Sequence, residues 1–188
     1  LRDHGEVGPD QKVLVNGAAG GVGTFAVQIA KALGAEVTGV CSARNVEQTR
    51  GLGADAVIDY RREDFTRLGE RFDVYLDVAG SRTWADCRRV LKKDARVVLI
   101  GGPRKQVWLG PLSHVLGMQV AALGASQKVV FFITRRIPGD LQQLNDLISD
   151  GKLRPVIDRS YRLDEIHKAM AYLSEGHARG KVVIRIPG

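Results

Sequence analysis

The hydrophobic pattern near the start of the chain has the form strand, turn, helix. Residues 12–16 are a short apolar run, a glycine-rich stretch follows at 17–23, and apolar residues recur at helical spacing over 25–33. Gly34 follows the last apolar position, as is typical of a glycine that ends a helix. The pattern then predicts a second strand over 36–41.

The same alternation continues to the end of the chain. Further strands are predicted at 56–59, 72–78, 96–100, 129–133 and 181–186. Helices are predicted at 45–52, 63–68, 84–91, 141–148 and 164–173. Strands that alternate with helices of about ten residues imply right-handed crossovers and a parallel sheet with helices on both faces. We therefore predict an α/β, doubly wound parallel sheet (Rossmann fold) of about six strands, plus a C-terminal helix and strand.

Three glycines in the first turn, Gly17, Gly20 and Gly23, stand three residues apart. The usual fingerprint is G-x-G-x-x-G, and here the first glycine lies one residue early. A pyrophosphate at this helix N-terminus would meet the backbone N–H groups of Gly21 and Val22 and the positive end of the helix dipole. Gly20 would let the backbone approach the phosphates, and Gly23 would let helix and strand pack closely. The alternative is that these glycines form a packing turn without a ligand. The position of the turn in the first βαβ unit favours dinucleotide binding.

The end of the second predicted strand distinguishes NADP from NAD. NAD sites carry Asp or Glu about 20 residues beyond the turn to hold the ribose hydroxyls, whereas Cys41 ends the strand here. No carboxylate is present to repel a 2′-phosphate, Ser42 and Asn45 have hydrogen-bonding side chains, and Arg44 offers bidentate pairing. Tyr60 ends the third strand beside this place. The sequence therefore predicts NADP(H), with the alternatives of a solvent-facing Arg44 and a packing role for Tyr60 left open.

Composition narrows the kinds of partner. The 188 residues include 28 Lys and Arg against 21 Asp and Glu, a net charge of +7. The basic residues occur in scattered pairs, which favours a small anionic ligand and disfavours nucleic acid. The chain has neither a signal peptide pattern nor an apolar stretch of membrane-spanning length, so we expect no membrane partner.

Cysteines and histidines show no spacing typical of metal ligands, so no metal is expected. Cys41 and Cys87 are isolated, which favours a reduced, cytoplasmic protein and leaves a single disulfide open. No Tyr is followed by Lys four residues later, which excludes a short-chain dehydrogenase. The absence of an acid at the end of the second strand disfavours a methyltransferase.

Three segments occur in an order that is typical of one family: VNGAAGGVGTFAVQIAKALGAEVTGVCSARN, LGADAVIDYRREDF and GHARGKVVI. On these segments, nearly the whole chain resembles the medium-chain dehydrogenase/reductase superfamily, and within it the zinc-independent quinone oxidoreductases. The resemblance implies hydride transfer from NADPH to a quinone or an enone-like carbonyl. A non-catalytic NADPH-binding sensor or interaction module is the alternative, and the chain alone does not separate the two.

The expected cofactor-binding residues combine this resemblance with the turn and the strand end. They are Ala19, Gly20, Gly21, Val22, Cys41, Ser42, Arg44, Asn45, Tyr60, Val78, Gly80, Ile100, Gly101 and Gly102. The resemblance places Val78 and 100–102 near the nicotinamide half, and it implies that 178–180 reach the cofactor from the C-terminal segment. It assigns no catalytic residue.

The resemblance also implies a division of the chain. The family's substrate domain precedes the part that matches, and we expect it to be absent here. Residues 1–153 would then form the NADP-binding domain, and 154–188 a segment that returns toward the substrate domain. We expect such a fragment to be inactive alone, and the fold leaves open a homodimer that extends the sheet through its sixth strand.

Overall fold

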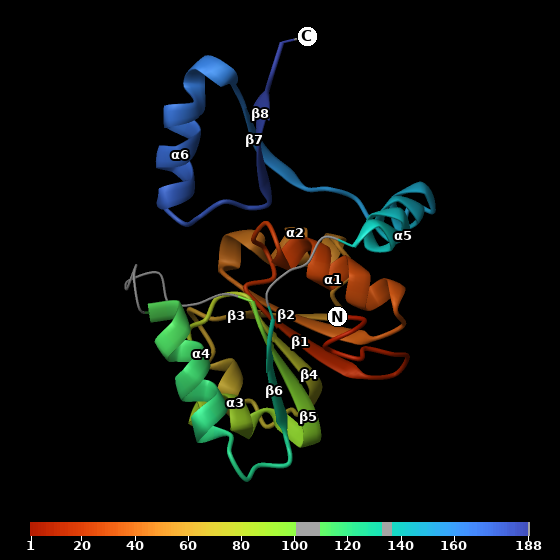
Figure 1. Ribbon diagram of the computed structural model, residues 1–188, viewed down its shortest axis with the longest axis vertical. Helices are drawn as coiled ribbons and strands as arrows, with labels where there is room; N and C mark the ends of the chain where they lie inside the picture. The colour runs from red at the N-terminus through yellow and green to blue at the C-terminus, as the bar shows by residue number, and fades with distance from the viewer. Residues whose placement is uncertain (101–109, 133–136, 188) are drawn as a thin grey trace.

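The computed structural model describes residues 1–100, 110–132 and 137–187. A parallel sheet with helices on both faces forms the larger part, and a smaller unit of one helix and two strands stands beyond it (Figure 1). Both of these parts contribute to the site described below.

Six parallel strands make the large sheet. They are β1 (Lys12–Asn16), β2 (Glu36–Cys41), β3 (Ala56–Asp59), β4 (Phe72–Asp77), β5 (Leu91–Leu99) and β6 (Lys128–Phe131). Their order is β3-β2-β1-β4-β5-β6, so the direction of winding reverses between β1 and β4. This is the order of the Rossmann fold, and it confirms the predicted doubly wound sheet.

The helices are short or of moderate length. They are α1 (Gly23–Ala32), α2 (Val46–Gly51), α3 (Trp84–Arg89), α4 (Gly110–Ala121), α5 (Pro138–Ser149) and α6 (Ile166–Ser174). Single 3₁₀ turns lie at Ala43–Asn45, Phe65–Arg67 and Leu163–Glu165. Among the residues that the structure describes, none of the helices has the length and apolar character that crossing a membrane requires.

Each face of the sheet has its own apolar core. Val13 and Val15 of β1 belong to the cluster that includes α1, whereas Leu14 belongs to the cluster that includes α3 and α4. All three side chains are fully buried. Burial on both faces explains why β1 is a continuous apolar run and not an alternating one.

Several element predictions were wrong. The segment 157–162 was not predicted as a strand, yet β7 (Ile157–Arg162) pairs in parallel with β8 (Lys181–Arg185) in a separate two-stranded sheet. Leu91 begins β5, although it was predicted on a helix, and the predicted helix at 63–68 is a single 3₁₀ turn. Helix α4 was also missed. The predicted strand at 129–133 begins one residue earlier, and Ile133 lies outside the described residues.

Gly23 begins α1 at a contact that leaves no room for a side chain. A Cβ at this position would lie 2.1 Å from the Gly17 carbonyl oxygen and 2.7 Å from the Ala18 Cα. The start of α1 therefore packs directly against the turn that follows β1. We expect Gly23→Ala to lower the free energy of unfolding by about 2 kcal/mol, because α1 must shift away from the turn. Urea unfolding measures this loss.

Gly20 provides the matched control for this change. A Cβ on Gly20 would meet only the Gly17 carbonyl oxygen, at 3.7 Å. Gly20→Ala is therefore expected to unfold at nearly the urea concentration of the unchanged chain. Equal losses in the free energy of unfolding of the two variants would show that the close contacts at Gly23 do not cause the loss.

Candidate functional site

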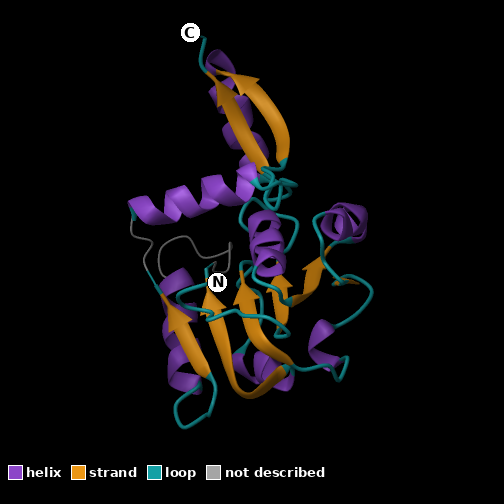
Figure 2. Ribbon diagram, turned by 90° about the vertical axis from the view of Figure 1, so that its right-hand side faces the viewer, coloured by secondary structure: helices purple, strands orange, loops and turns teal. Residues whose placement is uncertain are grey.

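A cavity of about 850 Å³ opens at the carboxyl ends of β1, β2 and β4. In Figure 2 the arrowheads of the large sheet point toward the β7–β8 unit, and the cavity lies between these two parts. The winding of the sheet reverses at this place, between β1 and β4. Ligands of doubly wound folds bind at such reversal points.

The structure places most of the predicted residues along this one cavity. Its lining includes Ala19, Gly20, Gly21, Val22, Cys41, Ser42, Arg44, Asn45, Tyr60 and Val78. Gly80 and Ile100 are described but do not line it. Gly101 and Gly102 lie outside the described residues. The lining also includes side chains that the sequence did not suggest, among them Asn16, Arg82 and Lys181.

The glycine-rich turn presents free backbone donors to the cavity. The N–H of Gly20 donates to Gly17, and the N–H of Thr24 donates back to Gly20. Within the described residues, no backbone hydrogen bond uses the N–H of Gly21 or Val22. These two groups stand at the start of α1, where the helix dipole favours an anion.

The end of β2 forms a second polar part of the wall. Ser42 and Asn45 are buried, and the Asn45 amide Nδ2 donates to Ser42 Oγ at 3.2 Å. That bond leaves the hydroxyl hydrogen of Ser42 available to a ligand. Burial, and to a smaller extent the charge of Asp59 at the end of β3, raises the pKa of the Cys41 thiol, so the thiol itself carries no charge that would repel a phosphate. Tyr60 is about half exposed at the end of β3.

The segment 176–181 crosses the cavity from the C-terminal unit and is tied to the large domain. Arg44 Nη2 donates to the His177 carbonyl oxygen at 2.8 Å. Gln48 Nε2 donates to the Arg179 carbonyl oxygen at 2.7 Å. Gly180 comes so close to the glycine-rich turn that a Cβ on Gly21 would lie 3.1 Å from its carbonyl oxygen.

A buried polar network lies under the opposite end of the cavity. Asn16 Nδ2 donates to Asp77 Oδ1 at 2.9 Å and to the Tyr75 hydroxyl at 3.1 Å. Asp77 Oδ1 also accepts the N–H of Gly80 at 2.9 Å. Asp77 is fully buried, and burial raises its pKa. This network was not predicted from the sequence; an aspartate at the end of an apolar strand, with a glycine three residues later, is the signal that could have indicated it.

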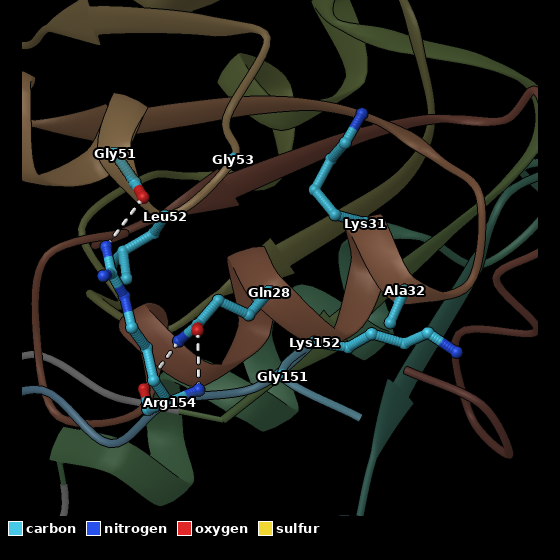
Figure 3. A pocket seen from close by; sticks show the side chains of 9 residues that line it. All are labelled: Gln28, Lys31, Ala32, Gly51, Leu52, Gly53, Gly151, Lys152 and Arg154. Carbon is cyan, nitrogen blue, oxygen red and sulfur yellow. Dashed lines mark hydrogen bonds between the residues drawn. The ribbon is translucent and has the colours of Figure 1, made fainter. Parts of the chain in front are cut away.

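A second hollow, of about 550 Å³, lies beside the carboxyl end of α1 (Figure 3). There the Gln28 amide donates to the Arg154 carbonyl oxygen at 3.0 Å and accepts the Arg154 N–H at 2.8 Å. Arg154 Nη2 donates to the Gly51 carbonyl oxygen at 2.9 Å. Because these bonds join the segment after α5 to α1 and α2, we interpret the hollow as a structural joint.

Fold and cavity together define the class of this protein: it has the dinucleotide-binding domain found in dehydrogenases. A family model described as zinc-binding dehydrogenase matches residues 52–184. The chain belongs to this family, among the medium-chain dehydrogenases/reductases, and corresponds to their C-terminal, cofactor-binding part.

Relatives and solved structures agree with this membership. Quinone-oxidoreductase QR1 of Triphysaria versicolor is 33% identical over an alignment of 183 positions, gaps included, that covers 94% of this chain and 53% of that protein. Mitochondrial NAD(P)H oxidoreductase RTN4IP1 of Mus musculus is 36% identical over an alignment of 192 positions, gaps included, that covers 94% of this chain and 48% of that protein. The quinone oxidoreductase structure from Coxiella burnetii matches with a TM-score of 0.82 at 28% identity. The match covers 97% of this chain and 55% of the chain in that structure. This chain thus spans about half the length of the relatives that it matches.

The family description names zinc, and a zinc site needs three or more ligating side chains close together. No group of three or more His, Cys, Asp or Glu side chains that could hold a metal ion occurs in residues 1–100, 110–132 and 137–187. Cys41 and Cys87 are both buried and free, so they form no disulfide. The described part of the chain therefore does not fit a zinc site.

Proposed function

We propose that this chain is the NADP(H)-binding domain of an oxidoreductase that transfers hydride from NADPH to a quinone or an enone-like carbonyl. One observation carries the proposal. Free N–H groups at the start of α1 share a cavity with Ser42 and Arg44, and no carboxylate ends β2. Relatives named as quinone and NAD(P)H oxidoreductases support the reaction class. Trans-enoyl reductase pgmF of Aspergillus terreus, 31% identical over an alignment of 212 positions, gaps included, supports the enone alternative.

Each part of the cavity has a proposed task. The N–H groups of Gly21 and Val22 bind the pyrophosphate, and Ser42 and Arg44 bind the 2′-phosphate. The turn that begins with Val78 forms the wall beside the nicotinamide. When NADPH is bound, its nicotinamide ring supplies the hydride, and the protein supplies position and electrostatics.

The proposal divides the chain at its C-terminal unit. Residues 1–153 form the cofactor-binding domain, and 154–188, part of which lines the same cavity, return toward the substrate domain of the longer relatives. Ile166, Met170 and Leu173 support this division, because they lie four and three residues apart on α6 and are 48%, 61% and 43% exposed. Such spacing places them on one side of the helix, and an exposed apolar stripe is typical of a surface that another domain covers.

We further propose a dimer interface and a cellular location for this chain. A homodimer through the β6 edge is proposed because Phe131 on that strand is 42% exposed. A cytoplasmic location is proposed from the two free thiols. The relatives named above include chloroplastic and mitochondrial proteins.

Calorimetric titration of this chain with NADPH and NADH tests the proposed function. We expect NADPH to bind at least tenfold more tightly, since the 2′-phosphate adds a charge-assisted contact. With a quinone present, residues 1–188 alone should consume NADPH at the protein-free rate, because they match about half of the relatives' length and the substrate site is proposed to lie in the other half. Failure to bind either dinucleotide would contradict the proposed cofactor, and equal affinities for the two would contradict the preference for NADP. Steady turnover of NADPH would contradict the proposal that the substrate site lies in the part of the relatives that this chain does not match.

A further inference from the structure

Lys181 is a cation of the C-terminal unit that lies beside the glycine-rich turn. A Cβ on Gly21 would lie 3.4 Å from Lys181 Cδ and 3.6 Å from its Nζ. The ammonium also lies 5.3 Å from the ring centroid of Phe25, on the first turn of α1. Lys181 lines the same cavity as the turn. Its charge is therefore next to the N–H of Gly21 proposed above to bind the pyrophosphate.

Within the described residues, no carboxylate lies within 4.0 Å of the Lys181 ammonium. The first turn of α1 has no acidic side chain that could neutralise it, and the basic residue of that helix, Lys31, lies in its last turn. The turn itself thus provides only backbone dipoles. A pyrophosphate carries two negative charges, and Lys181 is a full positive charge beside the place where it would sit.

The backbone at Lys181 is fixed from two sides. Its N–H donates to the carbonyl oxygen of Val156, the residue before β7, at 2.7 Å. One residue earlier, Gly180 approaches Val156 so closely that a Cβ on Gly180 would lie 2.4 Å from that oxygen. Arg179 is held on the other side, because its carbonyl oxygen accepts the Gln48 amide of α2. The lysine stem therefore starts from a defined position, and Phe25 orients its ammonium.

We propose that Lys181 forms an ion pair with the pyrophosphate of the bound dinucleotide. The C-terminal unit, and not the glycine-rich turn, then supplies the cation of the phosphate site. This inference rests on the proposed dinucleotide-binding function. It also separates two cations by what they recognise: Lys181 acts on the pyrophosphate that NADPH and NADH share, whereas Arg44 acts on the 2′-phosphate that NADPH alone carries.

The test uses variants that separate charge from packing. Lys181→Met removes the charge and keeps an unbranched stem against Phe25, and Lys181→Arg keeps the charge. Lys168→Met is the matched control, because Lys168 lies on α6, pairs with Glu165 at 3.0 Å and does not line the cavity. Binding is measured with NADPH, NADH, ADP-ribose and 2′-AMP, of which 2′-AMP alone has no pyrophosphate.

We expect Lys181→Met to weaken the binding of NADPH, NADH and ADP-ribose by about tenfold each. This is the lower end of the range for a charge-assisted contact, because the ammonium is partly exposed. Binding of 2′-AMP should not change, Lys181→Arg should recover most of the affinity, and Lys168→Met should bind like the unchanged chain. Unaltered ADP-ribose binding by Lys181→Met would overturn the inference, as would an equal loss of 2′-AMP binding. An unchanged chain that binds none of the dinucleotides would instead contradict the proposed function itself.

Discussion

Replacing Arg44 by alanine is expected to weaken NADPH binding about 50-fold and to leave NADH binding nearly unchanged. Arg44 is exposed at the mouth of the cavity, where its Nη2 donates to the neutral carbonyl of His177. A doubly charged phosphate is a stronger acceptor than a carbonyl, so the guanidinium should exchange partners when NADPH binds. A bidentate contact of this kind contributes roughly 1.5 to 3 kcal/mol, which corresponds to about 10- to 150-fold in affinity. Calorimetric titration of both dinucleotides measures the difference.

Arg50→Ala is the matched control for the Arg44 variant. Arg50 lies on α2, pairs with Glu47 at 3.1 Å and does not line the cavity. Its replacement removes the same charge from the same region without removing the proposed contact. If Arg44→Ala weakened both dinucleotides equally, or if Arg50→Ala weakened NADPH as much, the effect would come from net charge. Added salt should reduce the advantage of NADPH over NADH in the unchanged chain, because the additional contact is ionic.

The parts of this site that the sequence predicts are those encoded within a short stretch of chain. The glycine spacing indicated the first turn because Gly23 must pack against Gly17 and Ala18, and a side chain there would overlap them. The character of the strand end at 41–45 could also be predicted from the sequence, since the absence of an acid is visible in five consecutive residues. The parallel, doubly wound sheet followed from the alternation of strands and helices.

The parts that were missed depend on contacts between distant segments or on weak local patterns. Strand β7 has the sequence IDRSYR, which is polar and mostly exposed, and its backbone pairing with β8 makes it a strand. Helix α4 has the sequence GPLSHVLGMQVA, which has no clear polar face from which a helical stripe could be recognised. Most of the chain separates Gly21 from Lys181 in the sequence, so no local spacing could predict that Lys181 lies beside the turn.

Asp77 is the missed residue with the largest expected effect on stability. It ends β4 and is paired in register with Asn16, which ends β1, at the place where the sheet reverses its winding. One carboxylate oxygen accepts both the Asn16 amide and the Gly80 N–H, while within the described residues the other has no hydrogen-bond partner. Gly80 has a φ of +61°, and the flanking residues Ala79 and Ser81 line the cavity. Asp77 therefore holds the cavity wall to the sheet.

We expect Asp77→Ala to lower the free energy of unfolding by about 3 kcal/mol, because two buried donors lose their acceptor and a small cavity remains. Asp77→Asn is the control, since its amide oxygen can accept from the same two donors. It should therefore be much more stable than the alanine variant in urea unfolding at pH 7. Equal losses in the two variants would show that the hydrogen bonds of Asp77 do not stabilise this turn.

The pH dependence of Asp77→Asn tests the charge of the buried carboxyl. Burial is the main cause that raises the pKa of Asp77 above its ordinary value of 3.8, against smaller opposing effects that include the hydrogen bond from Gly80 and the charge of His114 on α4. Below pH 3.8 the carboxyl is protonated in both the folded and the unfolded chain. As the pH rises, the unfolded chain releases this proton first, so the contribution of Asp77 to stability falls until the pH exceeds its folded pKa. Asparagine does not titrate. The stability of Asp77→Asn relative to the unchanged chain should therefore increase between pH 3.5 and pH 7, and a constant difference over that range would mean that the folded carboxyl ionises at its ordinary pKa.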